Sequence, residues 1–384
     1  MQTDFEFPQG RLRLRRLPYR KNDLLRAWDA ADSYLLEHLA AADAPEPAAH
    51  IVIVNDSFGA LTLALHRYRP TAISDSFLSR QATLNNAELN RLDLAGLMLL
   101  DSLSLPDRPI DYLLIKAPKT LGLLEYQLHM LRPLLTPATK IIVAGMVKAL
   151  SANVWKCLEA LIGPTRTSLA VKKARLIFAD LDRRLRIPAN PYPRQYRLDV
   201  DVNGVNYDFP LDNHANVFSR DSLDIGTRFL LQHLPDNPAH RDFIDLGCGN
   251  GVVGLMIAQR LPEARIRFVD ESYMAVASAK DNFMRAFAGQ RQAEFLVGDG
   301  LTGFAENSAD CIVCNPPFHQ QHAVGDHIAW QMFDQARRVL RGGGELRVIG
   351  NRHLNYHSHL KKLFGHWEAV AANAKFTIIK TSKR

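Results

Sequence analysis

The chain has 384 residues, 47% of them apolar and 23% charged, which is the composition of a folded globular protein with two or more domains. No apolar run approaches the ~20 residues of a membrane span, the N-terminus lacks a signal-peptide pattern, and four cysteines are too few for a disulfide framework. The net charge is +7, and residues 1–200 carry all of it, with 27 Lys and Arg against 20 Asp and Glu. We therefore expect a cytoplasmic protein without a membrane partner, whose first half either has an ordinary solvated surface or binds a polyanion such as nucleic acid.

Four short apolar runs in the first half each end at a polar residue. Longer, helix-like segments separate them, so the runs predict parallel strands of an α/β sheet. The segment 11–16, in which arginine and leucine alternate, predicts an edge strand with a charged face. The four runs are 51–54, 71–74, 97–100 and 111–115, and they precede Asn55, Asp75, Asp101 and Lys116.

A proline-rich stretch at 188–193 separates the two halves and is typical of a linker. After it, the runs 196–202 and 205–209 flank Asn203-Gly204, a dipeptide that favours a two-residue β-hairpin turn. A helix is predicted next, with Asp221 or Ser222 as its N-terminal cap.

The second half alternates strands and helices more clearly. This alternation predicts a doubly wound parallel sheet, in which ligands bind beyond the carboxyl ends of the strands. The predicted strands are 243–246, 265–269, 295–297, 310–314, 345–349 and 376–380, and the predicted helices are 252–260, 274–287 and 330–340, the last of which is expected to stop at the glycine run 342–344.

The two halves repeat one pattern. Gly59 lies 192 residues before Gly251, and the strand ends that follow are offset by 195 to 199 residues. This spacing favours an internal duplication of one α/β domain, with the chance similarity of two such domains as the alternative. The first copy lacks two of the three turn glycines of the second, and it has Lys116 and Lys119 where the second has Asn315 and Phe318. We therefore expect the N-terminal copy to be degenerate.

A glycine turn follows the strand 243–246. Glycines at such a turn permit positive φ and let a ligand approach the backbone. The acid before the turn suits a cationic amino group better than a phosphate, which favours S-adenosylmethionine; a plain tight turn is the alternative. An acid at the second strand end would accept ribose hydroxyls and one at the third would accept an adenine amino group, unless they are ordinary helix caps. The predicted cofactor residues are Asp245, Gly247, Cys248, Gly249, Asn250, Gly251, Asp270, Asp299 and Asn315.

The predicted catalytic residues are Asn315, Pro316, Pro317 and Phe318, at the end of the fourth strand. Two prolines stiffen the turn because each fixes φ. The Asn315 side-chain oxygen and a neighbouring carbonyl can both accept hydrogens of a planar amino group. Phe318 offers a face on which a flipped base can stack. His319 and His322 are expected at the border of this pocket, and a role for either as a base is left open.

These motifs resemble those of class I methyltransferases that modify amino or amide nitrogens. The strings 213–220, 223–226, 270–272 and 315–322, together with a degenerate first half, resemble the ribosomal RNA guanine-N2 methyltransferases over nearly the whole chain. The resemblance implies two tandem class I (Rossmann-like) methyltransferase domains, each a parallel doubly wound sheet with an antiparallel edge strand. It implies a degenerate RNA-binding domain at 1–187 and a catalytic domain at 188–384. The implied reaction is methyl transfer from S-adenosylmethionine to the N2 of one guanine in 23S rRNA, with 16S rRNA as an alternative substrate.

Two other functions stay open: N5 methylation of a protein glutamine, which uses the same Asn-Pro-Pro chemistry, and RNA binding without catalysis. Cys311 and Cys314 are predicted to face opposite ways in one strand, and no second cysteine pair completes a zinc site, so no metal is expected. The predicted RNA-binding residues are Lys172, Lys173, Arg175, Arg183, Arg184 and Arg186, with a merely solvated surface as the alternative.

Overall fold

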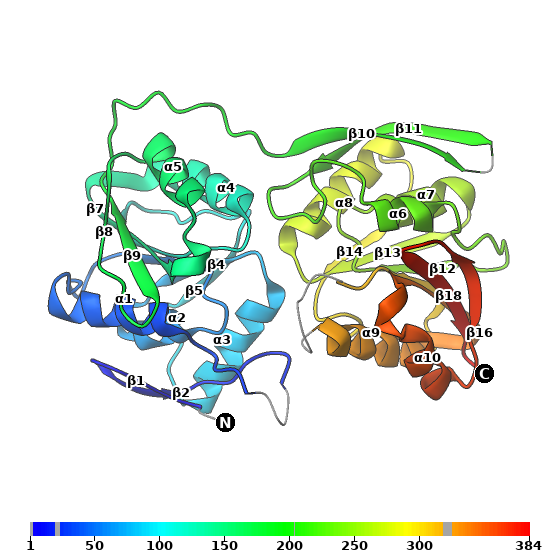
Figure 1. Cartoon of the computed structure of the whole chain (residues 1–384), viewed down its shortest axis with the longest axis horizontal. Coiled ribbons are helices and arrows are strands. Elements are labelled where there is room, and N and C mark those ends of the chain that lie inside the picture. Colours follow the sequence, from blue (N-terminus) through cyan, green and yellow to red (C-terminus); the bar gives the residue numbers. More distant parts are fainter. Residues whose placement is uncertain (1–2, 20–23, 203, 318–324) are drawn as a thin grey trace. The chain divides into compact units, whose positions relative to one another are not determined.

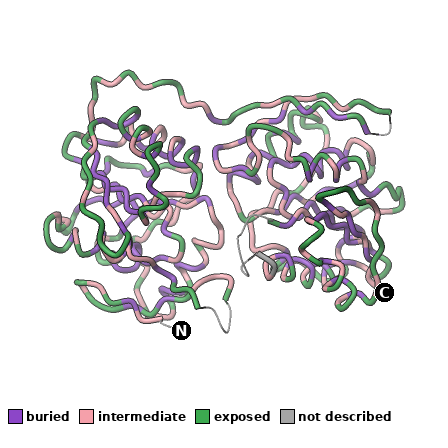
Figure 2. Tube along the Cα trace, viewed as in Figure 1, coloured by how far each residue is buried: buried purple, intermediate pink, exposed green. Residues whose placement is uncertain are grey.

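The computed structural model describes residues 3–19, 24–202, 204–317 and 325–384 (Figure 1). The chain divides into two compact units, Met1–Pro191 and Tyr192–Arg384. The division falls within the proline-rich stretch, four residues after the boundary predicted from the sequence. Figure 2 shows that buried residues are concentrated on the central strands of each unit. Within the described part of the chain, no helix is long and apolar enough to cross a membrane.

The C-terminal unit contains a seven-stranded sheet with the order β14-β13-β12-β15-β16-β18-β17. All neighbours from β14 to β16 are parallel, whereas β18 runs antiparallel to both β16 and β17. The predicted fold class is confirmed, but the antiparallel strand lies one place in from the edge. The strands are β12 (Asp242–Leu246), β13 (Arg265–Asp270), β14 (Glu294–Val297), β15 (Ala309–Cys314), β16 (Leu340–Asn351), β17 (Glu368–Ala372) and β18 (Phe376–Ser382).

Helices cover both faces of this sheet, and each face has its own apolar core. One core includes side chains of α7 and α8, and the other includes side chains of α9 and α10. Cys311 packs in the first core and Cys314 in the second, so the two thiols face opposite ways, and burial raises the pKa of both. The helices are α6 (Ile225–Leu231), α7 (Val252–Arg260), α8 (Tyr273–Ala286), α9 (Gly325–Val339), α10 (Tyr356–Phe364) and the 3-10 turn η4 (Arg352–Leu354).

Two local predictions in this unit were wrong. The glycine run does not separate helix from strand, because α9 ends at Val339 and β16 begins at Leu340 and continues through residues 342–344. The pairing of β16 with β15 is irregular there, and Gly343 has φ +81°, so the glycines accommodate an irregular strand. The N-terminal cap of α6 is Asp224, whose carboxylate accepts from Thr227 N, rather than Asp221 or Ser222.

The N-terminal unit repeats this topology, with the strand order β5-β4-β3-β6-β7-β9-β8. Its antiparallel strand, β9, is again one place in from the edge. Its strands are β3 (Ile51–Val54), β4 (Thr71–Ser74), β5 (Met98–Asp101), β6 (Ile110–Lys116), β7 (Leu135–Met146), β8 (Thr165–Thr167) and β9 (Ala174–Ala179). Its helices are α1 (Ala30–Ala41), α2 (Ala60–Ala64), α3 (Phe77–Leu89), α4 (Leu121–Leu131) and α5 (Ala152–Leu161), with 3-10 turns η1 (His66–Tyr68), η2 (Arg132–Leu134) and η3 (Val147–Ala149).

Each unit also begins with an antiparallel hairpin, formed by β1 (Asp4–Phe7) and β2 (Gly10–Arg13) in the first and by β10 (Arg194–Val202) and β11 (Val205–Asn213) in the second. One asparagine anchors the segment after β2 and another anchors β11. Asn86 accepts from Arg15 N and donates to the carbonyls of Arg15 and Phe58.

Asn282 makes the same three hydrogen bonds, with the N–H and carbonyl of Asp212 and the carbonyl of Asn250. Three equivalent bonds at equivalent places, in addition to one strand order, favour the internal duplication over chance similarity of two α/β domains.

Candidate active site

The three glycines of the turn after β12 have positive φ for three different reasons. A Cβ on Gly251 would lie 2.8 Å from the Ala279 Cβ, so this glycine permits the contact between α7 and α8. A Cβ on Gly247 would lie 3.4 Å from the carbonyl oxygen of Asn315. A Cβ on Gly249, at φ +54°, would meet no atom within 4 Å. Gly249 therefore borders open space, where a ligand can reach the backbone.

Asp270, at the end of β13, holds this turn in place. One carboxylate oxygen accepts from Gly249 N at 3.0 Å and the other accepts from Ser272 N at 3.0 Å. Burial raises the pKa of Asp270, and these backbone hydrogen bonds offset part of the rise. The residue predicted to bind ribose is thus first a support for the turn, and its contact with ribose stays a prediction.

Asp245 lies beneath the turn, with only 3% of its surface exposed. Its carboxylate accepts from Gly254 N of α7 at 2.8 Å. Burial raises the pKa of Asp245 to about 8, although the hydrogen bond from Gly254 lowers it in part. The structure therefore shows Asp245 joining β12 to α7, and its predicted role opposite a cationic amino group stays a prediction.

The raised pKa of Asp245 makes stability depend on pH. The folded chain holds this proton between the unfolded pKa of ~4 and the folded value, so the free energy of unfolding falls as pH rises across that window, by at most ~1.4 kcal/mol per pH unit. Asp245→Asn keeps an acceptor for Gly254 and removes the titration. We expect urea unfolding at several pH values between about 5 and 8 to show a smaller decline for the variant than for the wild type. Equal declines would contradict this assignment.

Two predicted cofactor residues of the turn direct their side chains into the protein. Asn250 is buried, and its amide nitrogen donates to Tyr196 Oη at 3.0 Å and to Asn213 Oδ1 at 2.9 Å, while its oxygen accepts from Val252 N. The prediction that the Asn250 side chain faces the cofactor is corrected, because this side chain ties the hairpin β10–β11 to α7. Cys248 is likewise buried in the core. Only the backbone of either residue remains available to a ligand.

Asn315 follows β15 and is oriented by α6. Its amide nitrogen donates to Thr227 Oγ1 at 3.1 Å, and Asp224 caps α6 one turn earlier. The Oδ1 atom of Asn315 is buried and has no hydrogen-bond partner among the described residues. A buried acceptor without a partner costs about 1–3 kcal/mol, so its persistence at a strand end indicates a site that binds a donor. Thr227, which the sequence analysis missed, fixes the amide so that the oxygen is the free end.

The remaining predicted site residues are placed in part. Pro316 is buried and Pro317 is exposed. Asp299 is half-buried and accepts from Gln331 Nε2 of α9 at 3.0 Å, and burial raises its pKa. Phe318, His319 and His322 lie outside the described residues.

The N-terminal unit fills the corresponding place with its own charges. Lys116, at the end of β6 as Asn315 is at the end of β15, pairs with Asp29 at 2.8 Å and with Asp32 at 2.7 Å. Asp29 caps α1 as Asp224 caps α6. Burial alone would lower the pKa of Lys116, but the two carboxylates raise it. Asn55, with φ 65°, stands where the other copy has Gly247. These features support the expectation of a degenerate N-terminal copy.

The predicted RNA-binding residues lie near the end of the N-terminal unit. Lys172 and Lys173 are the two exposed central residues of a tight turn that joins Val171 to Ala174 through two backbone hydrogen bonds. Arg183 and Arg186 are exposed, and Arg184 is paired with Asp182 at 3.2 Å. The half-buried Arg175 begins the strand after this turn and has a buried Nε without a partner among the described residues.

Gly249 gives a direct test of the site. Gly249→Ala adds a methyl group to the open space at the turn, so we expect it to abolish measurable S-adenosylmethionine binding in isothermal titration. Gly365→Ala is the matched control, because Gly365 also has positive φ (+86°) and no atom within 4 Å of its Cβ position. Both substitutions carry a strain of about 1–2 kcal/mol, but only the first should affect the cofactor. Equal affinity in the two variants would place the cofactor elsewhere.

Comparison with known proteins agrees with this architecture. Residues 2–183 match the family model of the RLMG N-terminal domain, and residues 208–380 match the methyltransferase small domain. A solved structure of T. thermophilus 16S rRNA N2 methyltransferase with AdoMet and guanosine is similar in fold, with a TM-score of 0.76 at 20% identity, over 100% of this chain and 98% of that one.

Curated relatives are similar over nearly the full length. The ribosomal RNA large subunit methyltransferase G of Streptomyces avermitilis is 50% identical over 98% of both chains. The protein of that name from Aeromonas salmonicida is 48% identical over 100% of both. These matches confirm the resemblance noted in the sequence, and the chain therefore belongs to the ribosomal RNA large subunit methyltransferase G family.

Proposed function

We propose that this protein transfers a methyl group from S-adenosylmethionine to the exocyclic N2 of one guanine in 23S rRNA, in the cytoplasm. The observation that carries the proposal is the buried, unpartnered Oδ1 of Asn315 at the carboxyl edge of the sheet. Membership of the family supports the reaction and the large-subunit substrate, since relatives of 45–50% identity bear that name.

The residues of the site would position the guanine amino group. Asn315 Oδ1 accepts one amino hydrogen, and the hydrogen bond from Asn315 to Thr227 keeps the amide in this orientation. This contact aligns the nitrogen lone pair for attack, which is the kind of positioning that lowers the barrier of a bimolecular step. The bound cofactor supplies an electrophilic methyl group on its sulfonium. Phe318 is proposed to stack on the base, and Pro316 and Pro317 hold the backbone of the turn stiff.

The cofactor is proposed to lie against the glycine turn. The open space at Gly249 and the shape fixed by Gly247 and Gly251 fit a ligand in contact with the backbone. Asp270 and Asp299, at the next two strand ends, are proposed to accept from its ribose and adenine. Asp245, Cys248 and Asn250 support the turn from below, and Asp245 is the one of these three that could also sense a cationic amino group.

The N-terminal unit is proposed to bind RNA, because it carries the whole excess of positive charge. The backbone of its Lys172-Lys173 turn adds to this. Both residues have positive φ, 49° and 64°, in a turn that asparagine and glycine normally form. Strain of this kind persists where the side chains have a use. The arginines at 175, 183, 184 and 186 are proposed as further phosphate contacts.

Mass mapping of rRNA from a strain that lacks this protein tests the proposed function. We expect one guanine of 23S rRNA to lose a methyl group and to regain it when the wild-type gene is supplied. A lost methyl in 16S rRNA would establish the small-subunit alternative. A lost methyl on a protein glutamine, with unchanged rRNA, would establish protein methylation, and a complete set of methyl groups in both would favour RNA binding without catalysis.

A further inference from the structure

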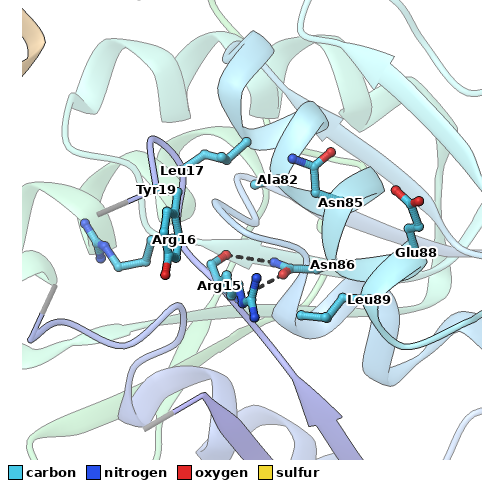
Figure 3. Close-up of a pocket in the computed structure, with 9 residues that line it drawn as sticks. All are labelled: Arg15, Arg16, Leu17, Tyr19, Ala82, Asn85, Asn86, Glu88 and Leu89. Carbon is cyan, nitrogen blue, oxygen red and sulfur yellow. Dashed lines mark hydrogen bonds between the residues drawn. The ribbon is translucent and has the colours of Figure 1, made fainter. Parts of the chain in front are cut away.

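A groove on the N-terminal unit lies between α3 and the segment that follows β2, and it has a volume of about 470 Å³. Figure 3 shows Leu17 and Tyr19 on one side of the groove and Asn85 and Glu88 of α3 on the other. The segment is held firmly at Arg15, whose N–H and carbonyl both bond to the Asn86 side chain. The groove therefore has a rigid floor.

The second copy of the fold shows why this groove is open. The three equivalent hydrogen bonds of Asn86 and Asn282 place Arg15 where the other unit has Asp212. In the C-terminal unit, Asp212 pairs with Arg285 of α8, and Ser278 Oγ of α8 accepts from His214 N at 3.0 Å. These bonds join the segment after the hairpin to the helix and close the gap between them.

The N-terminal unit lacks the groups that make those bonds. The helix caps Ser76 and Ser272 set the register between α3 and α8. In that register, Ala82 stands where the other copy has Ser278, and Leu89 stands where it has Arg285. The closing hydrogen bond and ion pair are therefore absent from this copy, and the side chains along the gap remain available to a ligand.

The lining of the groove combines a cation, an aromatic face and amide groups. The Arg15 guanidinium lies 5.7 Å from the centre of the Tyr19 ring, and no described carboxylate pairs with it. Tyr19 is 59% exposed, so its ring is open to a further partner. Asn85 Oδ1 accepts from Gln81, which leaves the Asn85 amide nitrogen as a donor. Glu88 adds an acceptor at the far side.

This combination suits one unpaired nucleotide. A guanidinium binds phosphate, and an aromatic ring stacks on any base. The Glu88 carboxylate repels phosphate but accepts hydrogens from an exocyclic amino group. The charges thus set an orientation, with phosphate at Arg15 and the base edge toward Asn85 and Glu88. A base with an amino group fits this edge better than uracil does.

We propose that this groove binds a single-stranded nucleotide of the rRNA substrate, with its phosphate at Arg15, its base stacked on Tyr19 and its amino edge facing Asn85 and Glu88. The groove would be an RNA contact additional to the Lys172-Lys173 turn. The inference rests on the proposed function in one respect, namely that the bound polymer is rRNA.

The test uses the full-length protein and protein-free 23S rRNA, with dissociation constants measured at several salt concentrations. Tyr19→Ala should raise the dissociation constant about fivefold or more, while Tyr19→Phe, which keeps the ring, should match the wild type. Arg15→Gln should flatten the salt dependence of log K by ~0.7–0.9. Arg13→Gln is the matched control, because Arg13 is exposed and two residues away but does not line the groove.

Competition by short homopolymers tests the base edge. Oligo(C) and oligo(A) should displace the rRNA from the wild type better than oligo(U), and Glu88→Gln should reduce this difference. Unchanged affinity of Tyr19→Ala, in a protein that still methylates rRNA, would overturn the groove proposal alone. A wild type that methylates no rRNA would instead overturn the proposed function. Thermal unfolding of Tyr19→Ala should match the wild type, since the side chain is exposed.

Discussion

Asn315→Ala is expected to lower the turnover of rRNA methylation by about 10²–10³-fold, because it removes a preorganised polar contact at the reacting centre. The alanine removes the unpartnered Oδ1 that we assign to the guanine amino group. It leaves the glycine turn intact, since the nearby backbone contact of Gly247 is with the carbonyl of residue 315. The affinity for S-adenosylmethionine, measured by isothermal titration, should therefore change little.

Variants of Thr227 serve as controls for orientation. Thr227→Val removes the hydroxyl that receives the Asn315 amide, which frees the amide to rotate; the loss of one hydrogen bond of ~1 kcal/mol predicts about a fivefold fall in turnover. Thr227→Ser keeps the hydroxyl and should retain most of the activity. Near wild-type turnover of Asn315→Ala would refute the assigned role of Asn315, and loss of cofactor binding in the same variant would make it a cofactor ligand instead.

Replacing Lys172-Lys173 by Asn-Gly is expected to make the protein more stable and weaken its binding to RNA. Both lysines have positive φ, which costs about 1–2 kcal/mol for each ordinary residue, and Asn-Gly adopts the same turn readily. Loss of two phosphate contacts should flatten the salt dependence of log K by ~1.4–1.8, at ~0.7–0.9 for each contact. Most substitutions that impair function leave stability unchanged or lower it, so the opposite signs make this test specific.

Lys361→Gln with Lys362→Gln is the matched control for that double variant. These two exposed lysines of α10 carry the same charge in the C-terminal unit. Their removal lowers the net charge equally and should leave the salt dependence of RNA binding near the wild-type slope. Similar slopes for the two double variants would mean that the Lys172-Lys173 turn has no contact of its own with RNA. Cofactor affinity should be unaffected in both.

The strand ends of both units could be predicted from the sequence because their signals are local. A short apolar run followed by a polar residue marks the carboxyl end of a buried parallel strand, and β3, β4 and α7 have the predicted bounds. The repeat was also predictable, since its offsets drift by only a few residues. The glycine run in β16 was misjudged because glycine ends a helix and permits an irregular strand equally well.

The side-chain network of the site could not be predicted, because its partners are distant in the sequence. Asn250 bonds to Tyr196 and Asn213, which precede it by 54 and 37 residues, so nothing local indicated that its amide turns inward. Thr227 precedes Asn315 by 88 residues. Its only local signal is its place three residues after the capping Asp224, which predicts a helix start and not a contact with the catalytic turn.

The ion pairs of Lys116 with Asp29 and Asp32 give the two units different dependence on cellular supply. The N-terminal unit contains the filling of its vacated site within its own chain, so no small molecule adds to its stability. Ligand at a hundredfold excess over its dissociation constant stabilises a native state by ~2.7 kcal/mol, and only the C-terminal unit has a place for it. When the methyl donor is scarce, the half that performs the chemistry becomes the weaker one, while the half proposed to bind RNA keeps its stability. Under starvation the protein would thus pass from modifying its substrate to merely occupying it.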